Sequence, residues 1–493
     1  MKVIISATLR TFFGRTAETE IQGNTIGEIL QRITEEYPDT GKGLFDENGK
    51  IRQFVRIYAD DRDYTDPEKH NELLTDVQEI LLLPFVAGGA PDGSEGSENN
   101  ASIISDERRK EVRLDDKEIE RFNKHLLLRE VGVKGQKRIR AAKVVIVGAG
   151  ALGSPVIQYL AAAGVGTLKI IDFDEVSLGN LQSQVLHSSR DVKRPKVASA
   201  RDTVRNIDRS IEVIPENTQL TAENALQLME GYDLVIDCTD NYKARYLIND
   251  ACILSGIPLI FGSIYQFEGQ VSVLGYGNGP CLRCIYPEPP APGLVPTCAE
   301  GGTISPLSGI IGSIQANEAL KLIIGIGEHL SGKLLTVDTL GLRSRVLSVK
   351  HSCSCPLCGD NPTIFAPEDF DYEEFCGLKE DENDIPVEGL TPKELAQRIE
   401  HGDPITIVDV REPHERAIVR FPGALVIPIG QLARRQKELN PEQDTIFICK
   451  EGKRSILAIN TLREAGYKGP LYNLKGGMDA MKDIIFTNEG GWL

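Results

Sequence analysis

One short segment near the middle of the chain restricts the possible folds more than any other feature. The apolar run KVVIV (143–147) is followed at once by Gly148-Ala149-Gly150-Ala151-Leu152-Gly153 and then by a helical pattern. Glycines there allow a tight turn and let backbone N–H groups approach a phosphate at the start of a helix. The segment predicts a nucleotide-binding α/β domain whose phosphate site is lined by Gly148, Gly150, Ala151 and Gly153.

The sequence around this loop supports a doubly wound parallel sheet. Four more apolar runs alternate with helical patterns across 115–360: TLKIID (167–172), IEVIP (211–215), DLVIDC (233–238) and PLIFGS (258–263). Asp172 ends the run TLKIID, nineteen residues after Gly153, where a carboxylate can accept a hydrogen bond from a ribose hydroxyl. Taken alone, this pattern favours a dinucleotide-binding dehydrogenase.

The length and two breaks in composition divide the chain into three domains. At ~150 residues per domain, 493 residues predict about three. Residues 90–114 are rich in Gly, Ser, Asn and charge, and 361–386 contain nine acidic residues and one lysine, so we expect a flexible linker and a solvated acidic linker. The expected domains are 1–89, 115–360 and 387–493.

The charge balance narrows the function classes. Fifty-five basic and 72 acidic residues give a net charge of −17, which disfavours direct nucleic-acid binding and anionic membranes. The chain shows no signal-peptide pattern, and its most apolar stretch, 303–327, is interrupted by Asn317, Glu318 and Lys321. We therefore expect a cytoplasmic protein without membrane contact, whose ten cysteines serve metal or thiol chemistry.

Four of these cysteines form two CxxC pairs, Cys281/Cys284 and Cys355/Cys358. Four thiolates in this arrangement predict a closed, tetrahedral and therefore structural Zn²⁺ site. The alternative is two unrelated pairs of reduced thiols.

Several motifs in 115–360 resemble the ubiquitin-activating-like adenylyltransferases, a family that includes the bacterial molybdopterin-synthase adenylyltransferase and its thiamin counterpart. The motifs are Leu181-Gln182, Arg194-Pro195-Lys196, DCTDN (237–241) and Cys298-Ala299-Glu300-Gly301-Gly302. The resemblance implies that the site binds ATP and Mg²⁺ instead of NAD. A glycine carboxylate would attack the α-phosphate and release pyrophosphate.

The same resemblance implies roles for individual side chains. Lys196 would neutralise the phosphates, Asp240 would hold Mg²⁺, and Asn180 and Asn241 would line the pocket. Charge neutralisation by a lysine and a metal ion is what such phosphoryl chemistry requires.

Two positions depart from the family pattern. The family has arginine at the positions of Lys124, a finger supplied by the other subunit of a homodimer, and of Ser183. Lysine keeps the charge but loses the bidentate geometry, and serine loses the charge. Lys193 or Arg194 are candidate substitutes, and without a substitute we expect adenylation to be slow or lost.

Cys449 ends the apolar run TIFIC and is followed by Lys450, Lys453 and Arg454 around a glycine, and then by a helical pattern. Backbone N–H groups and cations around the sulfur stabilise a thiolate or persulfide. The loop resembles a rhodanese active site, as do IVDVREPHE (407–415) and NLKGGMDA (473–480). The four residues between Cys449 and Arg454 fit sulfur chemistry, whereas phosphatases of this fold have five.

Cys298 is a second candidate for sulfur chemistry. It lies in a glycine-rich loop, VPTCAEGG, and the family resemblance implies a role in acyl transfer. The alternative is a free loop thiol.

Residues 1–89 show a β-α-β-β order, with a helix opened by a Thr25-x-x-Glu28 capping box. They end in Gly88-Gly89 and resemble the ubiquitin-like sulfur carriers, whose β-grasp fold and terminal glycine thiocarboxylate are thereby implied. Here Ala90 follows, so the Gly89 carboxyl is an amide that cannot attack ATP. Either a protease cuts after Gly89 or the domain only docks, and we expect cleavage because the linker is accessible.

Together these features predict adenylation of a ubiquitin-like sulfur carrier, either its own residues 1–89 or a separate one, followed by sulfur transfer from Cys449. The sulfur donor would be thiosulfate or a cysteine desulfurase. Two alternatives remain open. In the first the chain adenylates the carrier, but the product is a protein or cysteine conjugate. In the second the nucleotide site is degenerate, and the chain is a scaffold or only a sulfurtransferase. The final sulfur acceptor (molybdopterin, thiamin, cysteine or tRNA) also remains open.

Overall fold

A computed structural model gives the fold. It describes residues 1–84, 101–290 apart from residue 129, 302–376 and 387–481. The first range has gaps at 6–12, 14, 15, 17, 39, 41–43, 47–50, 53, 54, 60, 61, 65, 76 and 78. The chain forms two compact units, one with the described residues up to 376 and one with those from 387 onward, and each is described by itself.

The N-terminal residues form a five-stranded sheet in the order β2-β1-β5-β3-β4. Only the central pair β1 and β5 is parallel, which is the β-grasp arrangement expected from the sequence. Helix α1 buries Ile26, Ile29 and Ile33, and Thr25 caps its start by accepting a hydrogen bond from the Glu28 N–H (3.2 Å). The elements are β1 Lys2–Ile5, β2 Glu18–Glu20, α1 Ile26–Glu36, β3 Val55–Ala59, β4 Arg62–Asp63, the short helix η1 Pro67–Asn71 and β5 Glu79–Pro84.

The central domain is built on an eight-stranded sheet in the order β13-β12-β11-β10-β9-β6-β7-β8. Strands β8, β7, β6, β9 and β10 are parallel, and β11–β13 continue the sheet antiparallel. The strands are β6 Lys143–Val147, β7 Thr167–Ile171, β8 Glu212–Glu216, β9 Leu234–Asp237, β10 Leu259–Tyr265, β11 Glu268–Leu274, β12 Lys333–Asp338 and β13 Arg343–Ser348. The order in which strands are added to the sheet reverses between β6 and β9, and open α/β sheets bind ligands at such a point.

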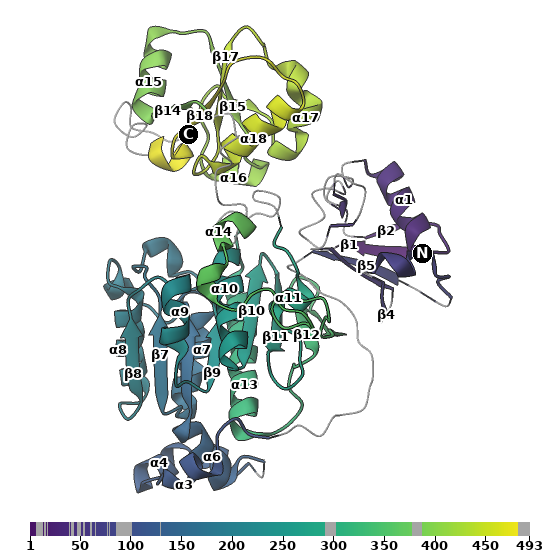
Figure 1. Cartoon of the computed structure of the whole chain (residues 1–493). Helices are drawn as coiled ribbons and strands as arrows, with labels where there is room; N and C mark the ends of the chain where they lie inside the picture. Colours follow the sequence, from purple (N-terminus) through teal and green to yellow (C-terminus); the bar gives the residue numbers. More distant parts are fainter. Residues whose placement is uncertain are drawn as a thin grey trace. The chain divides into compact units, whose positions relative to one another are not determined.

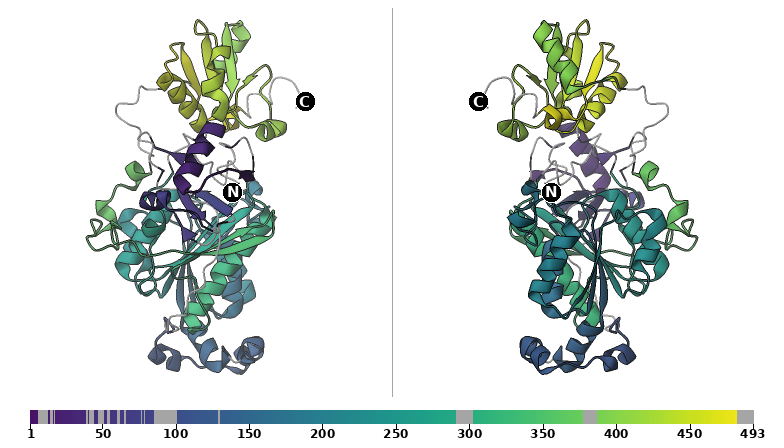
Figure 2. Two further views of the ribbon diagram at one scale, coloured as in Figure 1. Left: turned by 90° about the vertical axis from the view of Figure 1, so that its right-hand side faces the viewer. Right: turned by 90° about the vertical axis from the view of Figure 1, so that its left-hand side faces the viewer.

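Helices cover both faces of this sheet (Figures 1 and 2). Helix α13 packs on α7 and on β10 and β11, whereas α9 packs on α10. These helices are α7 Gly153–Ala163, α8 Lys196–Ile207, α9 Ala222–Met229, α10 Tyr242–Ser255 and α13 Ser305–Ile324. The predicted doubly wound fold is therefore confirmed. Within the described parts of the chain no helix is long and apolar enough to span a bilayer.

The expected linker 90–114 is wrong in its second half. Residues 101–114 fold onto the central domain: Ile104 is 1% exposed, and Arg108 of α3 (Asp106–Glu111) pairs with Asp233. Burial of Ile104 and this ion pair outweigh the polar composition of the segment. Helices α4 Asp116–Arg121, α5 Asn123–Leu126 and α6 Gly132–Ala141 continue the chain to β6.

The expected acidic linker 361–386 is also wrong for its first part. Residues 367–376 form η4 Pro367–Asp369 and α14 Tyr372–Phe375, and Tyr372 and Cys376 are buried. Phe370, Tyr372 and Phe375 pack on the central domain, and these contacts keep the segment folded although it is rich in acidic residues. Residues 377–386 lie outside the described residues.

The C-terminal unit is a parallel five-stranded sheet in the order β14-β18-β17-β15-β16, as expected for a rhodanese-like α/β domain. Its strands are β14 Gly389–Leu390, β15 Ile405–Asp409, β16 Leu425–Val426, β17 Asp444–Ile448 and β18 Leu471–Leu474. Its helices are α15 Pro392–His401, α16 Pro413–Ile418, η5 Ile429–Gln431, α17 Leu432–Arg435, η6 Gln436–Glu438 and α18 Lys453–Glu464. Cys449 directly follows β17 and belongs to the same hydrophobic core cluster as Phe447 and Ile459.

Candidate functional site

The glycine loop after β6 needs glycine for two different reasons. Gly148 has φ +100°, and a Cβ there would lie 2.7 Å from the Cys238 carbonyl oxygen. A Cβ on Gly153 would lie 2.0 Å from the Gly148 oxygen. At Gly150 a Cβ would meet nothing nearer than 3.6 Å, so the backbone between the two tight positions has room around it. The loop therefore has the shape that a phosphate requires at the start of α7.

Asp172, which is predicted to accept a hydrogen bond from a ribose hydroxyl, holds the glycine loop in place through backbone hydrogen bonds. Its Oδ2 accepts from the Ala149 N–H (2.8 Å) and its Oδ1 from the Asp174 N–H (2.9 Å). Burial raises the pKa of Asp172, and the charge of Lys196 opposes that shift. The ribose contact stays a prediction.

Lys196 begins α8 and reaches the same edge of the sheet, where its side chain is buried. Its Nζ lies 2.7 Å from Asp174 Oδ2 and 3.9 Å from Asp172 Oδ2. Structure and sequence thus place a lysine beside the glycine loop, where it can also neutralise a phosphate.

His187 also holds the loop, and sequence reasoning missed it. With the imidazole assigned as the neutral tautomer protonated on Nε2, it donates to the Ala149 carbonyl (2.9 Å) and accepts from Ser199 Oγ (2.9 Å) on Nδ1. Burial lowers the pKa of His187 from its usual value of 6.5. A single histidine between Leu186 and Ser188 gives no sequence signal for this role.

The polar residues expected to line the pocket have local partners. Asn180 accepts from Ser177 Oγ (2.7 Å), and Asn241 caps α10 by accepting from the Ala244 N–H (2.9 Å). Ser183 is 9% exposed and contributes no charge. Asp240 is exposed in the turn after β9, so its carboxylate is available to a cation. The nucleotide roles of these four residues stay predictions.

Two residues that the sequence did not single out shape the turn that carries Asp240. Buried Asp237 accepts from the Thr239 N–H (2.8 Å) and Oγ (2.6 Å). Arg245 donates to the Thr239 carbonyl (3.0 Å) from α10. Gly148 packs against the same turn, so the phosphate loop and the Asp240 turn support each other.

Lys124 does not join these residues within one chain. It is exposed on α5, two residues after Phe122, whose ring lies against Gly164 at the end of α7. The chain enters β7 after Gly164, so Lys124 lies at the edge of the sheet opposite the glycine loop. Of the two candidate substitutes, Arg194 is already paired with Asp191 (2.5 Å) and Asp202 (2.6 Å), and Lys193 is exposed.

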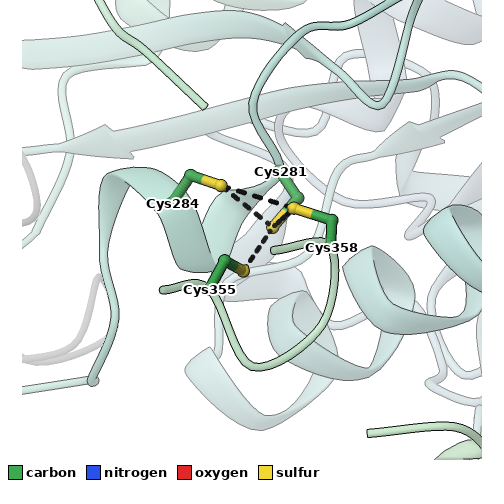
Figure 3. Close-up of side chains that lie close together, drawn as sticks. All are labelled: Cys281, Cys284, Cys355 and Cys358. Carbon is green, nitrogen blue, oxygen red and sulfur yellow. Dashed lines mark hydrogen bonds between the residues drawn. The ribbon is translucent and has the colours of Figure 1, made fainter. Parts of the chain in front are cut away.

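The two CxxC pairs come together (Figure 3). Their ligand atoms all lie within 4.8 Å of one another, with Cys281 Sγ 3.5 Å from Cys355 Sγ and Cys284 Sγ 3.4 Å from Cys358 Sγ. Four sulfurs bound at about 2.3 Å to a tetrahedral Zn²⁺ lie roughly 3.8 Å apart. Contact with Cys281 lowers the pKa of the Cys284 thiol to about 7 and that of Cys355 well below its usual range. The donor set and its spacing fit a zinc ion.

Cys449 lies in a very different setting. It is 1% exposed at the end of β17, and the Gly452 N–H donates to its Sγ at 3.0 Å. Gly452 has φ +95° and caps α18, so the sulfur faces the start of a twelve-residue helix. Backbone N–H donors at a helix start are the surround that the sequence predicted for Cys449, and its role as a persulfide carrier stays a prediction.

The cations near Cys449 are partly neutralised. Arg454 forms a bidentate pair with Glu415, with both N–O distances at 2.7 Å. The pair joins α18 to the segment 407–415, and sequence reasoning missed the role of Glu415. We therefore assign Arg454 to holding the loop, and a direct role in catalysis stays a prediction.

Cys298, with Gly88 and Gly89, lies outside the described residues. Their predicted roles in acyl transfer and as the carrier terminus stay predictions.

The folds and sites define a class: an α/β nucleotide-binding domain with a four-cysteine cluster, joined in one chain to a β-grasp domain and a cysteine-loop domain. Family models match accordingly, namely the ThiS family over 3–89, the ThiF family over 122–357 and the rhodanese-like domain over 391–483.

Full-length relatives agree with these matches. The chain is 41% identical over 375 residues to the probable adenylyltransferase/sulfurtransferase MoeZ of Mycobacterium tuberculosis, covering 74% of this chain and 93% of that protein. It is 37% identical to the adenylyltransferase and sulfurtransferase MOCS3 of Aedes aegypti, covering 75% and 87%. It is 46% identical to the sulfur carrier protein adenylyltransferase of Thermus thermophilus, covering 54% and 100%. The chain belongs to the adenylyltransferase/sulfurtransferase family, which confirms the resemblances drawn from the sequence.

Proposed function

We propose that this protein activates the C-terminal glycine of a ubiquitin-like sulfur carrier with ATP and then transfers sulfur to it from Cys449. The observation that carries the proposal is the presence, in one chain, of a glycine loop beside Lys196 and of a cysteine that accepts a backbone N–H at a helix start. Family membership supports both halves of the reaction.

In the first step a carboxylate oxygen of the carrier attacks the α-phosphorus of ATP. The bond to the β-phosphate oxygen breaks, and pyrophosphate leaves with the electron pair. The N–H groups of the glycine loop bind phosphate oxygens, and Lys196 balances their charge. Asp172 and His187 keep the loop in this shape.

Two metal ions belong to the proposal. Mg²⁺, which binds through one or two carboxylates and substrate phosphates, would neutralise phosphate charge next to Asp240. Zn²⁺ at Cys281, Cys284, Cys355 and Cys358 would be structural, because four protein ligands leave no open position.

In the second step the terminal sulfur of a Cys449 persulfide attacks the acyl carbon, and AMP leaves. A thiol then attacks the Cys449 sulfur, releases the thiocarboxylate and forms a disulfide with Cys449. We assign this thiol to Cys298, and an external thiol reductant restores both cysteines. Thiosulfate or a cysteine desulfurase would load the persulfide, and such thiol chemistry suits a cytoplasmic setting.

The carrier is either a separate protein or residues 1–89 of this chain. The second case requires hydrolysis of the bond between Gly89 and Ala90, because an amide carbonyl cannot attack ATP. Intact-mass measurement of the protein from active cells tests this: a fragment ending at Gly89 supports cleavage, and uncleaved chain alone contradicts it.

A homodimer is part of the proposal. Lys124 lies at the far edge of its own sheet, so it can reach a nucleotide site only in another subunit. Dissociation of the dimer should then lower adenylation.

Pyrophosphate exchange with ATP tests the adenylation step. Carrier-dependent exchange by the purified chain supports the proposal, and its absence favours the sulfurtransferase or scaffold alternative. If exchange is absent but appears in Ser183→Arg, the missing guanidinium explains the defect. A thiocarboxylate on the carrier glycine, detected by mass spectrometry, separates sulfur transfer from formation of a protein or cysteine conjugate.

A further inference from the structure

The segment before the C-terminal unit is held by a buried cation. Arg283 is 1% exposed and lies between the two cysteines of the first CxxC pair. Its guanidinium forms a bidentate ion pair with fully buried Asp250, at 2.9 and 2.7 Å. Such a pair is costly to bury, and removing one partner leaves the other charge buried without compensation, which is strongly destabilising.

Three aromatic rings surround the same guanidinium. Its central carbon lies 4.4 Å from the ring centre of Phe370, 4.6 Å from Phe375 and 5.1 Å from Tyr246. Tyr372 donates to Asp250 Oδ2 at 2.9 Å. Phe370, Tyr372 and Phe375 all come from the acidic segment, and we call their contacts with Arg283 and Asp250 the aromatic anchor.

The anchor determines where the fixed part of the chain ends. Without it, the chain is still held as far as η4, where buried Pro367 lies and which packs on α9 and α10. With it, the chain is held as far as buried Cys376, whose N–H bonds to the Tyr372 carbonyl (3.1 Å).

This difference changes the reach of the next domain. From Cys376 to Val387 there are eleven residues, which span at most about 40 Å, whereas the 18 residues from Asp369 span about 65 Å. Effective concentration of a tethered group falls roughly as the −3/2 power of the tether length, so releasing the anchor predicts about a twofold loss.

We propose that the aromatic anchor positions the sulfur-transfer step: by binding Phe370, Tyr372 and Phe375, Arg283 and Asp250 shorten the tether that joins Cys449 to the adenylating domain. This inference rests on the proposed function. The residues act through tether length and do not touch the reacting atoms.

The test uses the full chain with Phe370→Ala and Phe375→Ala combined, which leaves the Arg283–Asp250 pair intact. Phe365→Ala is the matched control, because it removes an aromatic ring from the same segment at a position that is 71% exposed. A third chain carries about twelve Gly and Ser residues inserted after Glu380, which lengthens the tether without touching the anchor.

Cys376 reports whether the anchor has opened. Burial raises the pKa of its thiol to about 11, so it should react slowly with iodoacetamide while the anchor is closed. Exposed Cys353 serves as the internal standard in peptide mapping. We expect labelling of Cys376 to rise at least about tenfold in the double variant and to stay unchanged in the control and the insertion chain.

Kinetics then test positioning. Single-turnover transfer from the Cys449 persulfide should slow about twofold in the double variant and about threefold in the insertion chain. Thiocarboxylate formation driven by added sulfide, which attacks the acyl-adenylate directly, and pyrophosphate exchange should stay at wild-type rates in both.

Two results would overturn the inference. One is unchanged persulfide transfer in a chain whose Cys376 has become reactive; the other is a parallel loss of pyrophosphate exchange, which would make the anchor merely structural. Absence of exchange in the wild-type chain would instead count against the proposed function and remove the anchor's kinetic role with it.

Discussion

The four-cysteine cluster and the Cys449 loop use the same side chain in opposite ways. In the cluster, four sulfurs from segments about seventy residues apart in sequence face one another, so each is a neighbour of the others. Cys449 has no sulfur neighbour among the described residues, and its close polar partner is the Gly452 N–H. Converging thiolates suit a closed metal site, whereas a lone sulfur at a helix start suits a group that gains and loses sulfur.

Removing Cys449 should produce the largest difference between the two sites. In Cys449→Ala, sulfur transfer to the carrier should fall at least about 1000-fold, because the persulfide has no other attachment point on its loop. Pyrophosphate exchange and zinc content should stay at wild-type values. Substantial persulfide transfer in this variant would mean that another cysteine carries the sulfur.

Removing one cluster cysteine should reverse that pattern. In Cys355→Ser, bound zinc should fall from one per chain toward none, and the domain should lose on the order of 3–5 kcal/mol, a fall in melting temperature of roughly 10 °C. Metal analysis and calorimetry measure both. Cys353→Ser is the matched control, since Cys353 is exposed and outside the cluster. Full zinc occupancy in Cys355→Ser would contradict a structural zinc site at these four cysteines.

The contribution of Glu415 to the Cys449 loop should be intermediate. Glu415→Gln breaks the bidentate pair with Arg454 and loosens the start of α18, so thiosulfate sulfurtransferase activity should fall about tenfold, equivalent to about 1.4 kcal/mol.

The same domain supplies a control for this prediction. Glu438 forms a bidentate pair with Arg435 at 2.6 and 2.7 Å on the surface. Glu438→Gln should change activity little, because an exposed ion pair screened by water contributes little to stability and this one does not touch the loop. Equal losses in both variants would show that Glu415 affects only folding.

The smallest expected effect concerns His187 at the nucleotide site. It is a change in how the free energy of unfolding depends on pH, which neither sulfur site should produce. Burial holds the pKa of His187 below 6.5, so the folded domain favours the neutral imidazole. Its stabilising effect is fully present above pH 6.5 and is lost as the pH falls below that value toward the lowered pKa. The free energy of unfolding should therefore fall as the pH drops through this range. Denaturation of the wild type and His187→Asn between pH 7.5 and about 5 measures this. An identical pH dependence in both would contradict the assignment.

The sequence by itself determined the secondary structure and the chemistry of the main sites. Strands with unbroken apolar runs, such as KVVIV and TIFIC, formed as expected because both faces of a parallel sheet are buried. The glycine loop, Lys196, the CxxC pairs and Cys449 were visible because local backbone geometry or ligand spacing requires particular residues at fixed distances.

Tertiary structure alone decided the rest. His187, Asp237 and Glu415 hydrogen-bond with partners that lie between two and 39 residues away in the sequence. No fixed spacing between such residues predicts these contacts. The acidic segment 361–376 reads as a solvated linker because its charges dominate its composition. It folds because two of its aromatic rings, Phe370 and Phe375, reach the Arg283 cation and the Tyr372 hydroxyl reaches Asp250. These partners lie about ninety or more residues earlier in the chain, and neither periodicity nor composition predicts such contacts.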